Sequence, residues 1–213
     1  MPDASRFTVR AAVAADRAAF YRICLLTGDG GADASGLCAD PELLGHVYVG
    51  PYLALQPQFA FALDDGTGAV GYVLGAEHTH DFEQECERTW WPGLRERYPA
   101  PEPGRRASWS RDEKLIDMIR NPLPTPGWAL ERHPSHLHID LLPHAQGQGL
   151  GAQLIDRLLT ALAAAGSPGV HLGVSTSNHR ARRFYARVGF TELDAGPHGV
   201  LMGRPLPRAL PTP

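Results

Sequence analysis

The sequence has almost no lysine and no excess of positive charge. Lys114 is its only lysine, and the 20 basic residues are outnumbered by 23 acidic ones, for a formal net charge of −3. Proteins that bind nucleic acid usually carry a basic excess, so we expect no nucleic-acid partner. The chain also lacks an apolar run of about 18 residues, which argues against a membrane span. Its first ten residues, MPDASRFTVR, contain no apolar signal region, so we expect a cytoplasmic protein.

Cysteine is equally scarce. Cys24, Cys38 and Cys86 are an odd and scattered set without CxxC spacing. Such a set argues against a disulfide framework and against a zinc site, so we expect no metal centre. Free thiols in the cytoplasm are the simplest interpretation. What remains is an ordinary globular composition of 43% hydrophobic and 20% charged residues over 213 positions.

The N-terminal part of the chain mixes strands and helices. We expect a strand at 7–13, a helix at 16–28 capped by Asp16, a flexible acidic loop at 28–36, a short helix with extended flanks at 41–55, and a hairpin at 58–77 around DDGTG. Residues from about 80 to 133 interrupt this pattern with prolines and tryptophans. We interpret them as an insertion that contains helices at 81–98 and 110–120.

From residue 135 the pattern becomes regular. It predicts a strand at 135–142, a helix at 150–166 with leucines every four residues, a strand at 169–175, a helix at 178–189, and closing strands at 190–196 and 199–206. This alternation is typical of the α/β class. We therefore expect a single domain over 1–213, with the insertion at about 80–133.

Three glycines stand between the strand and the leucine-rich helix, in the stretch HAQGQGLGAQL at 144–154. Gly147, Gly149 and Gly151 let the backbone approach a ligand closely, and the helix start presents free N–H groups and a positive dipole end. The loop should hold a phosphate or pyrophosphate. Its G-x-G-x-G spacing is not the G-x-G-x-x-G of dinucleotide-binding folds, and no Walker A lysine follows.

Two motifs carry a family resemblance. Residues 146–151 read QGQGLG, and residues 178–190 read NHRARRFYARVGF. In this order and context they resemble the signatures of the GNAT acetyltransferase superfamily. The segments TGDGGADAS, WWPGLRERYP and HLHIDLLP are also similar to the acetyltransferase-like domain of eukaryotic O-GlcNAc hydrolase and its bacterial relatives. The resemblance implies a mixed, mainly antiparallel sheet with a central splay between 135–142 and 169–175, flanked by helices.

The resemblance also implies acetyl-CoA as cosubstrate. Its pantetheine arm would lie along the main chain of Leu141 and Leu142. Asn178 would bond the arm or simply cap its helix, and Phe184 would pack near the arm or in the core. The pyrophosphate would lie on the amides of Gln146, Gly147, Gln148, Gly149, Leu150, Gly151 and Ala152.

Acetyl transfer needs an acid and a base. The resemblance places Tyr185 as the general acid that protonates the departing thiolate. Asp140 is the candidate base, because it shares one strand face with His136 and His138, although such a row can also mark a solvent-facing side. Further candidates are Glu77, His78, His80 and Asp81 at the end of the hairpin, Asp29 and Asp33 for a cationic acceptor, and Trp90, Trp91 and Trp109 as walls of the acceptor cleft.

The sequence thus predicts an acetyl-CoA-dependent N-acetyltransferase that acts on a primary amine of a small acceptor. Two alternatives stay open. One is a catalytically silent acetyl-CoA-binding pseudo-enzyme or sensor, and the other is a protein-lysine acetyltransferase, which an insertion covering the acceptor groove would disfavour. Each of these three interpretations is compatible with a homodimer.

Overall fold

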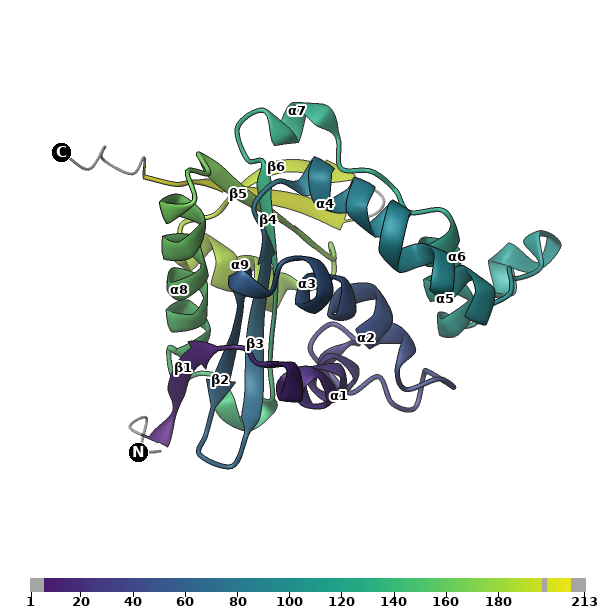
Figure 1. The fold of residues 1–213 in the computed structure, drawn as a ribbon, viewed down its shortest axis with the longest axis horizontal. Helices are drawn as coiled ribbons and strands as arrows, with labels where there is room; N and C mark the ends of the chain where they lie inside the picture. Colours follow the sequence, from purple (N-terminus) through teal and green to yellow (C-terminus); the bar gives the residue numbers. More distant parts are fainter. Residues whose placement is uncertain (1–5, 197–198, 208–213) are drawn as a thin grey trace.

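A computed structural model of the chain describes residues 6–196 and 199–207, and within them seven strands form one mixed sheet (Figure 1). The spatial order is β1-β2-β3-β4-β5-β7-β6. All neighbouring strands are antiparallel except β4 and β5. The predicted mainly antiparallel sheet is therefore confirmed. Its strands are β1 (Thr8–Ala11), β2 (Ala60–Asp64), β3 (Ala69–Ala76), β4 (Ser135–Leu141), β5 (Gly169–Val174), β6 (Thr191–Gly196) and β7 (Gly199–Pro205).

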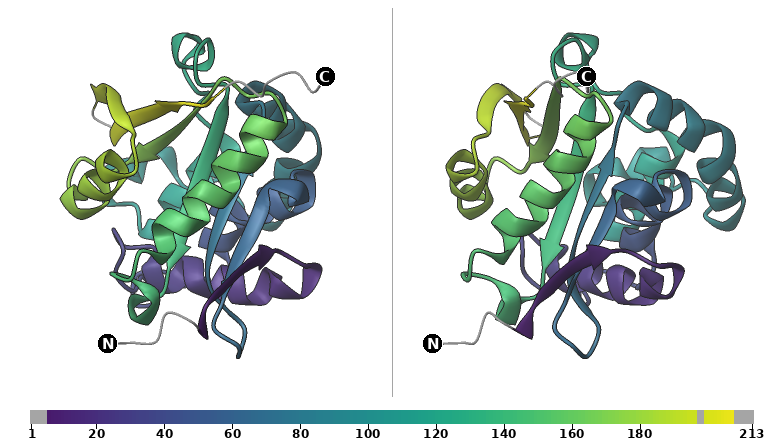
Figure 2. Two further views of the ribbon diagram at one scale, coloured as in Figure 1. Left: turned by 90° about the vertical axis from the view of Figure 1, so that its left-hand side faces the viewer. Right: turned by 60° about the vertical axis from the view of Figure 1, so that its left-hand side comes forward.

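Helices cover both faces of the sheet. Helix α8 (Leu150–Ala164) crosses one face of β2, β3 and β4, as Figure 2 shows. Its predicted leucine stripe is fully buried, because Leu150, Leu154, Leu158 and Leu162 are at most 2% exposed. Three helices, α1 (Arg17–Thr27), α2 (Leu43–Tyr48) and α3 (Gly50–Leu55), cover the opposite face. From Tyr72 to Ala76 the side chains of β3 alternate between these two cores, whereas Val70 breaks the alternation at a shift in the register with β2.

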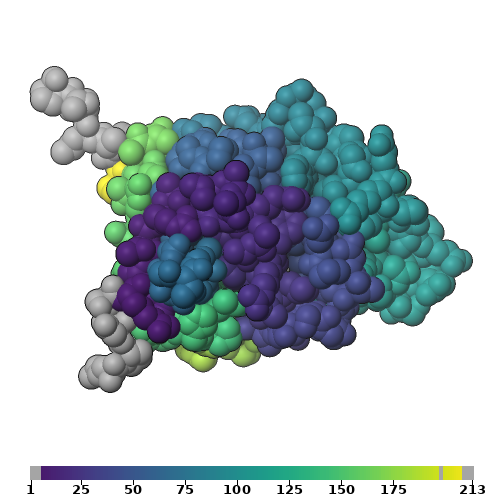
Figure 3. Space-filling view, turned by 60° about the horizontal axis from the view of Figure 1, so that its bottom comes forward, coloured from purple at the N-terminus to yellow at the C-terminus, as the bar shows by residue number. Residues whose placement is uncertain are grey.

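The helical segment at 79–130 leaves the end of β3 and returns at the start of β4. It consists of α4 (Thr79–Glu85), a π-helical turn (Cys86–Trp90), α5 (Trp91–Arg97), α6 (Arg111–Arg120) and α7 (Gly127–Leu130). Helices α5 and α6 pack on each other, and α6 packs on α2. The segment therefore projects to one side of the sheet (Figure 1), and in Figure 3 it forms the teal end of the molecule beside the blue α2–α3 region.

The strands β4 and β5 separate after a short contact. They pair in parallel only at Ser135 with Val170 and at His136 with His171. Beyond these two positions β4 continues beside β3 alone, while β5 continues beside β7. The predicted central splay is confirmed. Helix α8 packs on β4 beside it, and Phe184 of α9 (His179–Arg187) approaches Gly151 of α8.

Two local expectations are wrong. Asp16 does not cap α1 with its side chain; its carboxylate accepts from the Val13 amide at 2.8 Å and from Arg10 at 2.7 and 2.8 Å. The stretch 41–55 forms two helices, α2 and α3, which meet at Val49 instead of forming one helix with extended flanks. At Asp16 the ion pair with Arg10 overrides the capping pattern. At 41–55 the proline in the first turn of α3 overrides the pattern of a single helix.

Candidate functional site

One edge of β4 is unpaired where the splay opens. The Leu142 amide donates to the Val70 carbonyl at 2.9 Å, so these two residues form a hydrogen-bonded pair of the β3–β4 ladder. Two residues earlier, Asp140 and Tyr72 form the next such pair. Because such pairs alternate along antiparallel strands, the N–H groups of Ile139 and Leu141 point away from β3. In the described part of the chain no strand pairs with them on that side. This edge can bind an extended chain by main-chain hydrogen bonds.

The glycine loop continues directly from this edge. Gly147 and Gly149 have φ angles of 77° and 79°, which favour glycine, and a Cβ on either would meet no atom within 4 Å. Among the residues that the structure describes, the amides of 147–151 have no protein acceptor. The amides of Gln146 and Ala152 are taken by carbonyls of the loop itself. The free donors are therefore the central ones, next to the N-terminus of α8.

The side chain of Gln146 connects the loop to both sides of the splay. Its Nε2 donates to the Leu141 carbonyl at 2.7 Å, and its Oε1 accepts from Arg180 of α9 at 2.6 Å. Close by, a Cβ on Gly151 would lie 3.2 Å from the Phe184 ring, so this glycine lets α8 and α9 approach each other. The sequence indicated only the amide of Gln146, and the role of its side chain was missed because both partners are distant elements.

Asn178 begins α9 and has both side-chain groups engaged. Its Oδ1 accepts from the Ala181 amide at 3.0 Å, which is an N-cap bond, and its Nδ2 donates to the Gly30 carbonyl at 3.2 Å. The second bond brings the acidic loop at 28–36 beside the start of α9. Asn178 therefore joins two segments that are 148 residues apart in the sequence.

Tyr185 lies two turns further along α9 and is half-buried. Its ring packs on Phe184 and edge-on against Phe190, with centroids 5.4 and 5.9 Å apart. No residue in the described ranges hydrogen-bonds its hydroxyl. Burial, and after it the negative charge of Asp140, raise the pKa of Tyr185. The phenol is therefore protonated at neutral pH and shares an electrostatic environment with the carboxylate on β4.

The polar row on β4 is a hydrogen-bonded group and not a solvent-facing stripe. Tyr72 of β3 lies directly opposite Asp140 and donates to its Oδ2 at 2.6 Å. His138 Nε2 lies 3.2 Å from the same oxygen, and its ring is stacked on Tyr48. Burial opposes protonation of His138, but the Asp140 carboxylate outweighs it and raises the pKa of His138 to about 10. The two side chains form an imidazolium–carboxylate pair at neutral pH, with 29% and 19% of their surface exposed.

His136, two residues earlier, is held neutral. The Thr79 hydroxyl donates to the Pro134 carbonyl, so it can only accept from His136 Nδ1, 2.8 Å away. Nε2 is then the acceptor for the Tyr52 hydroxyl at 2.8 Å. Burial, with the nearby His171 and His138, lowers the pKa of His136 to about 3. This histidine joins β4 to α3 and α4 and is not a base at the splay.

The neutral state of His136 predicts an acid-sensitive fold. Its pKa falls from about 6.5 in the unfolded chain to about 3 in the folded one. Its contribution to stability is therefore complete above pH 6.5 and is lost as the pH falls towards 3. We expect His136→Gln, whose amide can replace both bonds, to show a shallower fall in Tm between pH 6.5 and 4. The difference should be several degrees, since 1 kcal/mol corresponds to roughly 2–4 °C at this size.

Differential scanning fluorimetry across this pH range tests the expectation. The exposed His80, whose Nε2 is hydrogen-bonded to Gln84 at 3.0 Å, supplies the control variant His80→Gln. Parallel curves for the parent and for His136→Gln would contradict the assignment of a half-buried neutral imidazole.

The other acidic and histidine candidates do not join this group. The register places Ala76 opposite His136, so the hairpin end with Glu77, His78, His80 and Asp81 lies at the far end of β4 from Asp140. Asp29 pairs with Arg111 at 3.6 Å, and Asp33 accepts from the Ser35 amide at 2.8 Å. These residues stabilise turns and surface contacts.

The tryptophans do not line the splay. Trp90 packs on Gly50 and donates to the His46 carbonyl at 2.9 Å. Trp91 is buried in the core beneath α4 and α5, and Trp109 donates to the Glu102 carbonyl at 2.9 Å. These contacts fix the helical segment to itself and to α2 and α3, and a tryptophan wall on the acceptor side stays a prediction. Tyr48, which no sequence pattern indicated, stacks on His138, and Tyr72 donates to Asp140.

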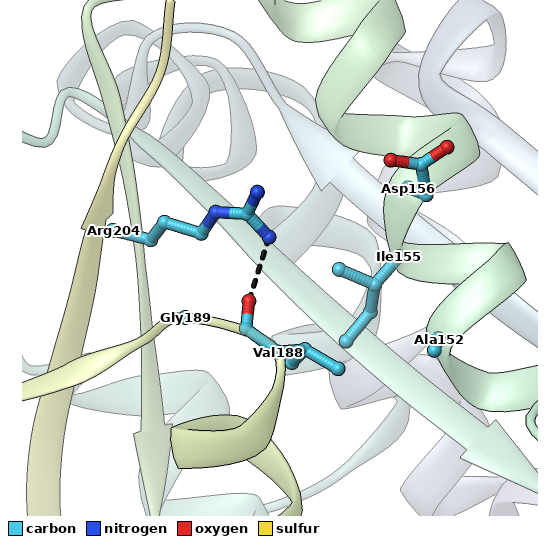
Figure 4. A pocket seen from close by; sticks show the side chains of 6 residues that line it. All are labelled: Ala152, Ile155, Asp156, Val188, Gly189 and Arg204. Atoms are coloured by element: carbon cyan, nitrogen blue, oxygen red, sulfur yellow. Dashed lines mark hydrogen bonds between the residues drawn. The ribbon is translucent and has the colours of Figure 1, made fainter.

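A hollow of about 350 Å³ lies between α8 and the end of α9 (Figure 4). It is bordered by Ala152, Ile155, Asp156, Val188, Gly189 and Arg204. Arg204 donates to the Val188 carbonyl at 2.6 Å, which leaves Asp156 on the opposite side. His138, Asp140 and Tyr185 are not among the residues that border this hollow.

Residues 41–190 match the acetyltransferase (GNAT) family, and the chain belongs to it. The crystal structure of SsHAT superimposes with a TM-score of 0.85 and 37% identity, covering 93% of this chain and 98% of that one. Rat O-GlcNAcase (Rattus norvegicus) is 27% identical over 194 residues. That alignment covers 90% of this chain, which spans about a fifth (21%) of the O-GlcNAcase sequence. A GCN5-like protein acetyltransferase of Mycobacterium tuberculosis is 31% identical over 117 residues, 49% of this chain and 55% of that protein.

These similarities confirm both predicted relationships, to GNAT acetyltransferases and to a segment of O-GlcNAcase. The protein is a GNAT-type acetyltransferase, and members of this family generally use acetyl-CoA. No helix in the described ranges is both long and apolar enough to cross a membrane.

Proposed function

We propose that this protein transfers an acetyl group from acetyl-CoA to a primary amine of a small acceptor. One observation carries the proposal: the unpaired edge of β4 leads directly into a row of free amides at the N-terminus of α8. An extended amide-bearing arm that ends in a pyrophosphate matches both features, because the edge supplies main-chain partners and the helix start favours negative charge.

In this proposal each part of the coenzyme meets a particular set of residues. The amides of 147–151, held by Gln146 and followed by Ala152, bind the pyrophosphate. The pantetheine arm lies along the edge of β4 at Leu141, whose amide is free, with Phe184 packing beside it. Leu142 borders the arm without a main-chain bond to it, because its amide and carbonyl are bonded to Val70 and Ala145. Asn178 positions α9 through its cap and its bond to Gly30. The family's use of acetyl-CoA supports this assignment.

The acetyl group then lies between the two diverging strands. The Leu141 amide, which faces the gap, donates to the thioester carbonyl oxygen and stabilises its developing negative charge. Asp140 accepts the proton that the acceptor amine must lose. As the C–N bond forms and the C–S bond breaks, Tyr185 donates its phenolic proton to the sulfur. His138 and Tyr72, which lie 3.2 and 2.6 Å from Asp140 Oδ2, hold this carboxyl group in place.

A coupled assay of thiol release tests the function directly. The parent protein is mixed with acetyl-CoA and a panel of small primary amines, and each product is identified by mass spectrometry. We expect acetylation of the amine nitrogen with release of one free thiol per turnover. Binding of acetyl-CoA without turnover of any amine would instead favour the silent binding protein.

The role of Asp140 gives a pH-dependent prediction. Asp140→Asn retains the size and the bond from Tyr72 but cannot accept a proton. We expect turnover to fall by roughly 10²–10⁴-fold, with the largest deficit at low pH, where the acceptor amine is mostly protonated and most needs a base. Acetyl-CoA binding should stay near the parent value.

The pH profile of kcat/KM for parent and variant checks this expectation. Asp117→Asn is the matched control, because Asp117 lies on the distant helix α6 and forms an ion pair with Arg106. A deficit that is equal at every pH would contradict the base assignment and leave Asp140 a purely electrostatic role.

A further inference from the structure

A buried thiol lies against the polar row of β4. The Cys24 Sγ, a ring nitrogen of His138 and a carboxylate oxygen of Asp140 all lie within 4.8 Å of one another. Cys24 belongs to α1 and is 2% exposed, whereas the other two groups belong to β4 and are partly exposed. Two packed elements of the core therefore bring together three different donor atoms: sulfur, nitrogen and oxygen.

We propose that Cys24, His138 and Asp140 bind a divalent metal ion of the zinc type. In tetrahedral zinc sites the bonds to sulfur are about 2.3 Å and those to nitrogen or oxygen about 2.0–2.2 Å, which places ligand atoms roughly 3.3–3.8 Å apart. His138 Nε2 and Asp140 Oδ2 are already 3.2 Å apart. The sulfur lies within 4.8 Å of both atoms, so it needs to approach them by about 1.3 Å at most to reach a spacing of about 3.5 Å, a movement that rotations of the three side chains share.

The chemistry of the donor set selects the ion. A thiolate, an imidazole and a carboxylate together suit a borderline-soft ion such as Zn²⁺, whereas Mg²⁺ and Ca²⁺ prefer oxygen ligands alone. As the metal binds, the Cys24 thiol and the His138 imidazolium each release one proton to solvent, so that a thiolate sulfur and an unprotonated ring nitrogen bind the ion. Three protein ligands leave a fourth position for water.

Tyr72 supplies an outer partner of the kind that such sites have. Its hydroxyl donates to Asp140 Oδ2 at 2.6 Å and lies 3.2 Å from His138 Nε2. The Tyr72 hydroxyl can keep its hydrogen bond to Asp140 while His138 binds the metal. Hydrogen bonds of this kind, from residues outside the metal ligands, orient the ligands. The site does not depend on acetyl transfer. A bound ion would, however, occupy Asp140 and so reduce any activity that needs this carboxylate as base.

Cobalt substitution tests the site without an activity assay. The full-length protein, free of acetyl-CoA, is titrated with Co²⁺ and followed by absorption spectroscopy. We expect saturation at one ion per chain, a near-ultraviolet band of thiolate-to-cobalt charge transfer, and loss of that band on addition of Zn²⁺. A chelator competition then gives the Zn²⁺ affinity.

Matched variants assign the ligands. Cys24→Ser should abolish the band and weaken Zn²⁺ binding by more than the roughly 10–100-fold that loss of an outer partner costs. Cys86→Ser should retain both, since Cys86 is an equally buried thiol (2% exposed) in the helical segment. His138→Asn should also weaken Zn²⁺ binding. Because His138 is partly exposed, this variant tests the site even if the Cys24 variant does not fold.

The absence of a stoichiometric thiolate band in the parent would overturn the proposal. So would unchanged Co²⁺ binding in both Cys24→Ser and His138→Asn, which would place the ion elsewhere. Neither result would bear on acetyl transfer, which the thiol-release assay measures independently.

Discussion

Replacing Tyr185 with phenylalanine should lower turnover with a true acceptor by roughly 10²–10⁴-fold, the usual contribution of a positioned acid or base. The variant keeps the ring and its packing on Phe184 and Phe190, so the fold and the splay should persist. It loses only a hydroxyl that has no hydrogen-bond partner in the described residues and whose pKa is raised by burial and by the charge of Asp140. Acetyl-CoA binding should therefore change little.

The measurement is kcat from thiol release, with binding followed separately by the Tm shift that acetyl-CoA produces. Tyr98→Phe is the matched control: it also removes one phenolic hydroxyl, which donates to Asp40 at 2.6 Å in the helical segment. That variant should lose some stability but retain turnover. If Tyr185→Phe turns over at the parent rate, its hydroxyl has no part in the chemistry.

Features encoded in short stretches of sequence could be predicted. The leucine stripe of α8, the hairpin around DDGTG and the glycine loop each follow from local spacing, and the structure has all three. The splay was predicted from a family resemblance that itself rests on two short motifs. Local patterns suffice here because helix periodicity and glycine conformations depend on neighbouring residues.

The contacts of the polar row could not be predicted, because they depend on strand register and helix packing. Tyr72 and Asp140 are 68 residues apart, and a shift of one residue between β3 and β4 would place them on opposite faces. Cys24 reaches the same group from a helix whose rotation about its axis the sequence leaves open. The absence of CxxC spacing predicts no metal site, yet ligands from two elements need no such motif.

The position of the helical segment at 79–130 illustrates a second limit. Its composition identified it as a break in the pattern, and its connections to β3 and β4 suggested a place over the acceptor side of the cleft. The structure packs it on the sheet face that carries Tyr72, in one core with α1 and α2. The close fits inside this core, such as Trp90 against Gly50, could not be predicted. The direction in which a segment leaves a sheet depends on such close fits, which only the folded chain shows.

Gly149→Glu should abolish acetyl-CoA binding. At about 100 times Kd, the parent should gain about 2.7 kcal/mol from the ligand, which corresponds to a rise in Tm of roughly 5–10 °C. In the variant a carboxylate would stand among the free amides of 147–151, occupy the helix start itself and repel the pyrophosphate. The Tm shift should therefore disappear, and isothermal titration calorimetry should detect no binding.

Two controls separate the charge from the backbone strain that any side chain meets at a φ of 79°. Gly166 has a φ of 99° at the opposite end of α8, and a Cβ there also meets no atom within 4 Å. Gly166→Glu thus adds the same charge and a similar strain away from the loop, and it should bind like the parent. Gly149→Asn accepts the left-handed conformation without a charge and should retain part of the Tm shift. If Gly149→Glu binds acetyl-CoA as tightly as Gly166→Glu does, the pyrophosphate lies elsewhere and the assignment of the loop fails.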